Sequence, residues 1–107
     1  MTKVKVNPGP CGFDTTITAE SNDEGMVEVK IVSGGKSIMA MAMAIGTEVD
    51  PYEVCLVKPG NGPYVEWASE NEFPVHACCP VFTAIGKCVE AEAGLALKQN
   101  VAIEFVD

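Results

Sequence analysis

The single histidine of the chain lies beside two adjacent cysteines, in the segment His76-Ala77-Cys78-Cys79-Pro80. Cys79 directly precedes Pro80, so we expect it to be the N-cap of a helix that begins at the proline. The backbone N–H groups and the dipole at a helix N-terminus stabilise negative charge, which favours the thiolate form of a cysteine there. A thiolate binds metal ions and attacks electrophiles. This segment is therefore the first candidate for chemistry.

A further cysteine, Cys11, follows Pro8-Gly9-Pro10 and precedes Gly12, which predicts a second tight turn at the end of a strand. Thiolate and imidazole groups are the ligands that zinc and iron–sulfur clusters prefer. The spacing of the histidine and the two adjacent cysteines matches no standard zinc-finger pattern, and a free cysteine is often a buried apolar side chain. A ligand or reactive role and a purely structural loop are both open at this point.

Other conspicuous side chains are expected to pack rather than to react. Cys88 lies on the apolar stripe of a long predicted helix, and Cys55 lies within a short one, so we assign both to the core. The methionines of the segment Lys36–Ile45 are also expected to pack, and Tyr64 and Trp67 to cover the edge of the core.

Composition excludes several classes of function. The net charge is −8, and the seven basic residues are all lysines, so there is no guanidinium group for bidentate contacts with phosphate or guanine. An acidic surface repels nucleic acid and is more compatible with a protein partner. The sequence contains no GxSxG, P-loop or GxGxxG motif, and its carboxylates are scattered over polar faces. We therefore expect a protein that is not an enzyme and does not bind nucleic acid.

The same composition bears on location and on the state of the thiols. The first residues lack the apolar run of a signal peptide, and no segment is long and apolar enough to cross a bilayer. We expect a cytoplasmic protein that does not bind membranes. Five cysteines, an odd number, in such a chain predict reduced thiols rather than a disulfide framework.

Periodicity predicts one α+β domain over residues 1–107, a small antiparallel sheet of three to four strands with helices packed on one face. Strands are expected at 3–7, 14–20, 26–32 and 100–106, the second and third forming a hairpin around the turn 21–25. Helices are expected at Lys36–Ile45, 50–56, Pro63–Glu70 and 80–93, with Asp50 as an N-cap and Gly94 ending the last one. Edge strands on so small a sheet also permit a homodimer.

This order of features resembles the IscU/NifU-like family, whose members are scaffolds for iron–sulfur cluster assembly, and the related small domains with a TSCPD motif. The resemblance rests on a Cys-Gly turn, a hairpin, a glycine-rich turn into a helix, and a cysteine-bearing loop that opens the last helix. The matching stretches are PCGFDTTITAESNDEGMVEVKIVSGGKSIMAMAMAIGTEVDPYEV and HACCPVFTAIGKCVE, together more than half of the chain. The family resemblance implies an IscU/NifU-like fold.

The resemblance also implies a ligand set. Cys11 matches the first cluster ligand and Cys79 the ligand that opens the last helix, while Cys78 falls where the family often has His or Cys. The middle ligand of the family corresponds to Gly34-Gly35, so that cysteine is missing, and Phe13 stands where the family has Asp. The predicted strand at 100–106 lies beyond the family pattern.

With this departure, the resemblance implies three thiolate ligands, Cys11, Cys78 and Cys79, and His76 as the imidazole ligand. The group that they would hold is zinc or an iron–sulfur cluster, and the chain would act as a scaffold or carrier. A second class of function is a protein-interaction or small-ligand module that kept the fold and lost the metal. A third is a thiol redox protein using Cys78 and Cys79, or Cys79 with Cys11 because adjacent cysteines form a strained disulfide ring.

Overall fold

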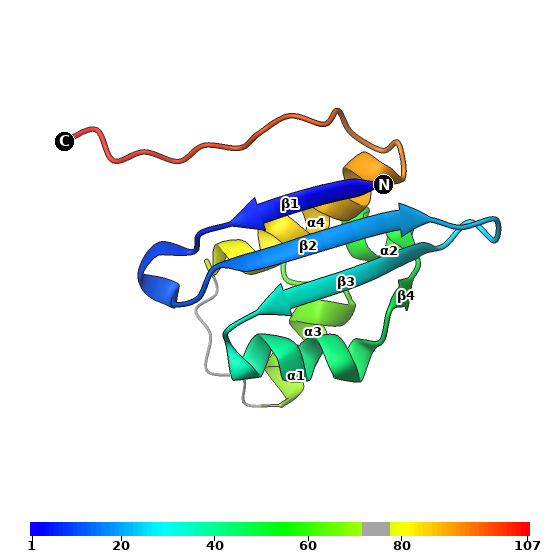
Figure 1. The fold of residues 1–107 in the computed structure, drawn as a ribbon, viewed down its shortest axis with the longest axis horizontal. Helices are drawn as coiled ribbons and strands as arrows, with labels where there is room; N and C mark the ends of the chain where they lie inside the picture. Colours follow the sequence, from blue (N-terminus) through cyan, green and yellow to red (C-terminus); the bar gives the residue numbers. More distant parts are fainter. Residues whose placement is uncertain (72–77) are drawn as a thin grey trace.

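A computed structural model describes residues 1–71 and 78–107, the side chain of Cys11 excepted. Within these residues the chain forms an α+β domain with a four-stranded antiparallel sheet in the order β1-β2-β3-β4 and four α-helices (Figure 1). The elements are β1 Thr2–Val6, the 3-10 helix η1 Gly9–Cys11, β2 Thr15–Ser21, β3 Val27–Ser33, α1 Lys36–Ile45, β4 Glu48–Val49, α2 Pro51–Cys55, α3 Pro63–Glu70 and α4 Pro80–Glu92. The predicted α+β class and antiparallel sheet are confirmed.

The hairpin of β2 and β3 is the centre of the sheet, as the alternation predicted. Val27, Val29 and Ile31 are buried, whereas Glu28 and Lys30 on the opposite face are exposed. Their partners continue the buried face, because Ile31 pairs with Ile17 and Val29 pairs with Ala19. One face of the hairpin therefore covers the core, and the other is polar.

Helix α1 forms over the residues predicted for it, where Met and Ala alternate along the sequence. Because successive residues in a helix are about 100° apart, the methionines point in different directions. Met41 is completely buried, while Met43 is 81% exposed. The expectation that these methionines pack is therefore right for Met41 and wrong for Met43.

Helix α4 carries the apolar stripe that the sequence predicted: its buried residues are Val81, Ala84, Ile85, Cys88 and Val89. It ends at Glu92, one residue before the predicted end. Gly94 follows with φ 75°, and the N–H of Leu95 bonds the carbonyl of Glu90 at 2.9 Å. This is the Schellman arrangement in which glycine terminates a helix.

The short helices also match their capping signals. Asp50 accepts a hydrogen bond from the backbone N–H of Tyr52 at 2.9 Å, with Pro51 at the first helical position.

In α3, Tyr64 is buried and Trp67 packs against the core. The sequence did not predict β4, because two residues that pair with Val27 and Glu28 leave no periodic signal.

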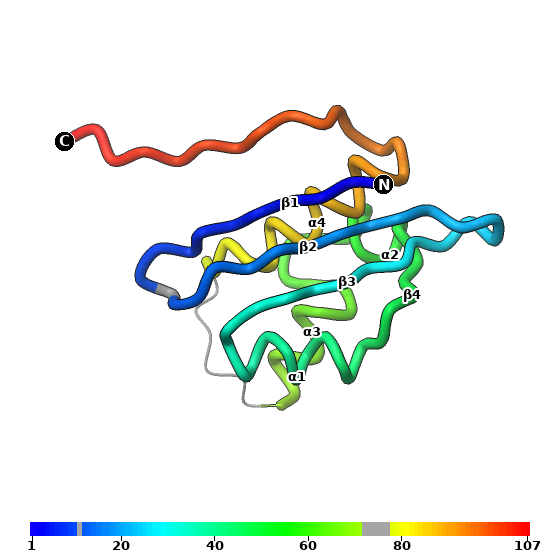
Figure 2. Tube along the Cα trace, viewed as in Figure 1, coloured from blue at the N-terminus to red at the C-terminus, as the bar shows by residue number. Residues whose placement is uncertain are grey.

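The strand predicted at 100–106 is wrong. In the tail, which we define as residues 95–107, the backbone forms no strand, although its sequence alternates as a strand would. Figure 2 shows the tail extending away from the end of α4. From residue 97 onwards its large apolar side chains are exposed: Leu97 83%, Val101 56%, Ile103 88%, Phe105 99% and Val106 92%. Alternation produces a strand only where another strand edge pairs with it, and the tail has no such partner among the described residues.

The carboxylate of Glu92 connects the C-terminal end of α4 to the sheet through hydrogen bonds. That carboxylate accepts hydrogen bonds from the Thr2 hydroxyl at 2.8 Å and from the Ser21 backbone N–H at 2.9 Å. These bonds, chiefly the one from the Ser21 N–H, lower the pKa of Glu92 to about 2. One turn earlier, the Cys88 thiol lies 3.4 Å from the carbonyl oxygen of Thr2. This end of α4 therefore lies beside the start of β1 and the end of β2.

The Glu92 contacts predict a specific dependence of stability on pH. Because the pKa is about 2 in the folded chain and 4.5 without these contacts, their stabilising effect is complete above pH 4.5 and is lost as the pH falls towards 2. The Glu92→Gln variant should therefore melt below the parent chain at neutral pH, and the difference in Tm should shrink below pH 4.5. Circular dichroism melts over this range measure it. Glu70→Gln, at an exposed position, is the control, and a Glu92→Gln effect independent of pH would contradict the assignment.

Candidate functional site

The two adjacent cysteines at the start of α4 have different surroundings. Cys79 is the N-cap of α4 and is 5% exposed, within the hydrophobic core cluster. Cys78, one residue earlier, is exposed to solvent. The predicted N-cap position of Cys79 is confirmed. The two thiols are therefore not equivalent, because one is held inside the protein and the other is accessible from outside.

The start of α4 lies at the same end of the sheet as η1. The other end of this helix contacts Thr2 and Ser21, so its N-terminus points towards the end of β1 and the start of β2. At that end Val6 pairs with Thr15, and Thr15 pairs with Ser33. Figure 1 shows the η1 loop, the start of α4 and the turn from β3 into α1 gathered there. The chain thus brings its two candidate segments to one end of the sheet.

Phe13 covers the glycine-rich turn at this end. A Cβ atom built on Gly34 would lie 3.0 Å from Cδ1 of Phe13, and one built on Gly35 would lie 3.4 Å from Cδ2. The ring therefore occupies the space in which a side chain at Gly34 would begin. Phe13 and the Gly34-Gly35 turn are therefore neighbours in the fold, which sequence reasoning did not detect.

A hydroxyl pair supports the same turn from beneath. The Thr15 hydroxyl, which is buried, lies 2.9 Å from the Ser33 hydroxyl and 3.1 Å from the carbonyl oxygen of Phe13. The Ser33 hydroxyl oxygen in turn accepts from the N–H of Gly35 at 3.1 Å. This network joins the end of the η1 loop to the start of the Gly34-Gly35 turn, so the turn has a defined geometry although it carries no metal ligand.

Two of the four predicted ligands cannot be placed by their side chains. His76 lies in the segment 72–77, outside the described residues, and only the backbone of Cys11 is described, as the last residue of η1. Among the side chains that the structure describes, no three of the types His, Cys, Asp and Glu are grouped to hold a metal ion. Cys78 and Cys79 are the two predicted ligands among these described side chains.

The two remaining cysteines are protonated and packed, as predicted. Burial raises the pKa of Cys88 to about 11, and the charge of Glu92 acts in the same direction. Burial also raises the pKa of Cys55 to about 11, and its thiol lies 3.6 Å from the carbonyl oxygen of Gly86. A thiol with such a pKa is protonated at neutral pH, and it is the thiolate form that attacks electrophiles and binds metal ions. Neither residue belongs to the candidate site.

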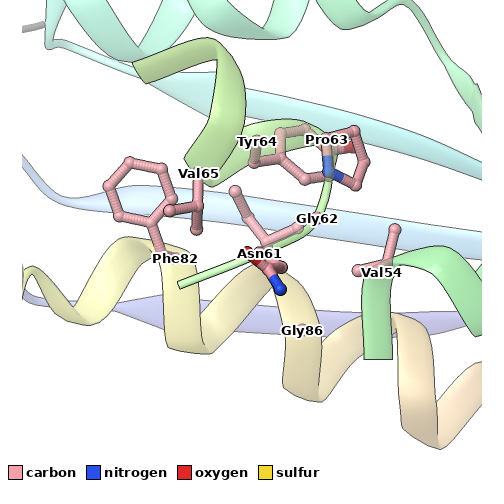
Figure 3. Close-up of a pocket in the computed structure, with 9 residues that line it drawn as sticks. Val54, Asn61, Gly62, Pro63, Tyr64, Val65, Phe82 and Gly86 are labelled. Carbon is pink, nitrogen blue, oxygen red and sulfur yellow. The ribbon is translucent and has the colours of Figure 1, made fainter. Parts of the chain in front are cut away.

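A small cavity between α2, α3 and α4 is too small to be a substrate site (Figure 3). Its volume is about 40 Å³, which is room for a water molecule, and its lining is largely apolar. Tyr64 lines it, and the hydroxyl of this residue is buried with no hydrogen-bond partner among the described residues. Burial raises the pKa of Tyr64 to about 12, so the phenol stays protonated.

Comparison with known proteins identifies a family but no characterised relative. No curated protein and no solved structure matches the chain. Within residues 1–71 and 78–107, no helix is both long and apolar enough to cross a membrane. A match over residues 2–105, nearly the whole chain, shows that it belongs to the family of unknown function DUF6951.

Proposed function

We propose that the chain binds zinc or an iron–sulfur cluster at the end of the sheet shared by η1 and the start of α4, and that it acts as a carrier or accessory module. The ligands would be the thiolates of Cys11, Cys78 and Cys79, with the imidazole of His76. The observation that carries the proposal is the direction of α4. Its C-terminus is held at Thr2 and Ser21, so its N-terminus and Cys79 lie towards η1.

The local physical chemistry supports thiolate ligands at this position. The N–H groups and the dipole at the start of α4 favour negative charge on Cys79. Because Cys79 is 5% exposed, a metal bound there would be shielded on one side by the core, while Cys78 would close the site from the solvent side. Phe13 covers the Gly34-Gly35 turn, so the fourth ligand has to come from elsewhere, and His76 is the residue of suitable type in the adjoining segment.

The likeness to IscU/NifU scaffolds is part of this proposal. The three loops that carry ligands in those proteins correspond to the η1 loop, the Gly34-Gly35 turn and the start of α4. Here the middle loop has no donor, and an aromatic ring lies over it. A chain with such a site would hold a metal ion or cluster without the complete ligand set of an assembly scaffold, which favours a carrier or accessory role.

The test is metal and acid-labile sulfide content of protein purified without oxygen. The parent chain should contain about one zinc ion, or iron with matching sulfide, per chain. Cys78→Ala should lose most of it, and the Tm of this variant should equal that of the metal-free parent chain, because Cys78 is exposed. Cys79→Ala should lose it as well. Cys55→Ala, which removes a thiol outside the site, is the matched control and should keep its metal.

Two results would refute the metal proposal. One is a parent chain with no stoichiometric metal after anaerobic purification and after reconstitution with zinc or with iron and sulfide. The other is metal that persists in both Cys78→Ala and Cys79→Ala. The first result would leave the second candidate function, a protein-interaction module without metal, which the exposed apolar side chains of the tail favour.

A further inference from the structure

We propose that the tail is an exchanged β-strand, which pairs with the free edge of β1 in a second copy of this chain. Two features of the described chain motivate this. The strand order places β1 at an edge of the sheet, with β2 as its pairing partner in the described residues. The tail alternates apolar and polar residues as a strand does, yet Ile103 is 88% and Phe105 is 99% exposed. An open strand edge and an unpaired strand sequence are complementary.

The edge of β1 has two distinct sides that an added strand must match. Thr2, Val4 and Val6 face the helices, the first buried and the two valines packed against the core cluster. Lys3 and Lys5 point to the opposite, exposed side. A strand that continues the sheet here must therefore present apolar side chains on the helix side and tolerate positive charge on the other.

The tail meets both requirements with a single choice of face. Val101, Ile103 and Phe105 lie on one side of an extended tail, and Glu104 lies on the other. If the apolar side extends the core, Glu104 is necessarily on the side of Lys3 and Lys5, whichever register is adopted, since side chains alternate with a period of two. Opposite charges on neighbouring strands stabilise the pairing. The net charge of −8 opposes association in general, so this local complementarity matters.

The direction of the tail favours a second copy over the same chain as the source of the strand. The tail leaves α4 where Glu92 contacts Thr2, at the start of β1, and Figure 2 shows that it runs in the direction of β1. Pairing within one chain would therefore be parallel, whereas every pair in this sheet is antiparallel. A tail supplied by a second copy can approach β1 in the antiparallel direction. A two-fold axis lets both copies exchange tails, so that each open edge and each tail is used.

This inference is independent of the metal proposal, and its test is the oligomeric state of the full chain. Sedimentation equilibrium over a concentration series should show a reversible dimer. Ile103→Asp should weaken the dimer by at least about tenfold, because it places a charge on the side that becomes buried. Ala102→Asp adds the same charge on the opposite side of the tail, towards the lysines, and should leave the dissociation constant within about twofold. Both positions are exposed in the single chain, so both variants should keep the parent Tm at concentrations at which the parent is a monomer.

Cross-linking distinguishes exchange between copies from pairing within one chain. A mixture of nitrogen-14 and nitrogen-15 protein is treated with a carbodiimide, which joins lysine amines to carboxylates. Cross-links of Lys3 or Lys5 to Glu104 should then include peptide pairs of mixed isotope. A monomer at all concentrations, a dimer insensitive to Ile103→Asp, or cross-links of unmixed isotope alone would each overturn the proposal.

Discussion

Replacing Met41 with alanine should lower the free energy of unfolding by about 2–5 kcal/mol. Met41, on α1, is completely buried and belongs to the core cluster that also contains Val29 and Ile31 of β3. The substitution removes buried apolar surface and leaves a cavity that rigid neighbours fill only in part. Since a domain of this size is stable by about 5–15 kcal/mol, the loss would be a large fraction of the total. Urea denaturation followed by circular dichroism measures it.

Met43 provides a matched control on the same helix, with the same residue type and the same substitution. It is 81% exposed, so Met43→Ala should change the free energy of unfolding by no more than about 0.5 kcal/mol. The slope of the denaturation curve should be unchanged in both variants, which shows that the difference lies in the folded state. Equal effects of the two substitutions would show that α1 does not pack by the face described for it.

Replacing Gly62 with alanine should cost about 1–3 kcal/mol from backbone strain, with a further loss from a steric clash. Gly62 has φ 105° and ψ 162°, a conformation that residues with a Cβ atom rarely adopt. A Cβ atom there would also lie 3.3 Å from the carbonyl oxygen of Glu53, which belongs to the backbone of α2. Backbone cannot rotate away as a side chain can, so α2 or the loop before α3 must shift. Thermal and urea denaturation would show the loss.

Two other glycines separate the causes of that effect. Gly60 also has a positive φ, 90°, but a Cβ atom on it would have no neighbour within 4 Å, so Gly60→Ala should show the strain without the clash. Gly86 lies inside α4, and a Cβ atom built on it would have no neighbour from outside the helix within 4 Å, so Gly86→Ala should stabilise the chain by about 0.5–1 kcal/mol. A Gly62→Ala variant as stable as Gly60→Ala would rule out the contact with Glu53.

Several elements could be predicted because the sequence signals that define them act over a few residues. Asp50-Pro51 marks the start of α2, Gly94 ends α4, and Pro80 begins it. Each of these residues satisfies or removes a backbone hydrogen-bonding group of its immediate neighbours, so its effect does not depend on the rest of the fold. The alternation in β3 likewise predicted its buried face, because the polar residues between the valines leave only one face to bury.

The tail shows where this kind of reasoning fails. Its alternation is as regular as that of β3, but Ile31 finds Ile17 across the ladder while Ile103 remains exposed. Strand formation requires a second strand, and the sequence of the first does not specify where that strand is or whether it belongs to the same molecule. The same limit explains why β4, with only two paired residues, was not predicted.

By itself, the amino-acid sequence determined the α+β class, the hairpin, the helix boundaries within one or two residues, and the candidacy of Cys11, His76, Cys78 and Cys79. The tertiary structure alone decided that Cys79 is buried while Cys78 is exposed, that α4 points its N-terminus towards η1, and that Phe13 lies over Gly34. The reason is physical: capping and periodicity depend on neighbours in the chain, whereas these features depend on contacts between residues far apart in it, such as Glu92 with Thr2.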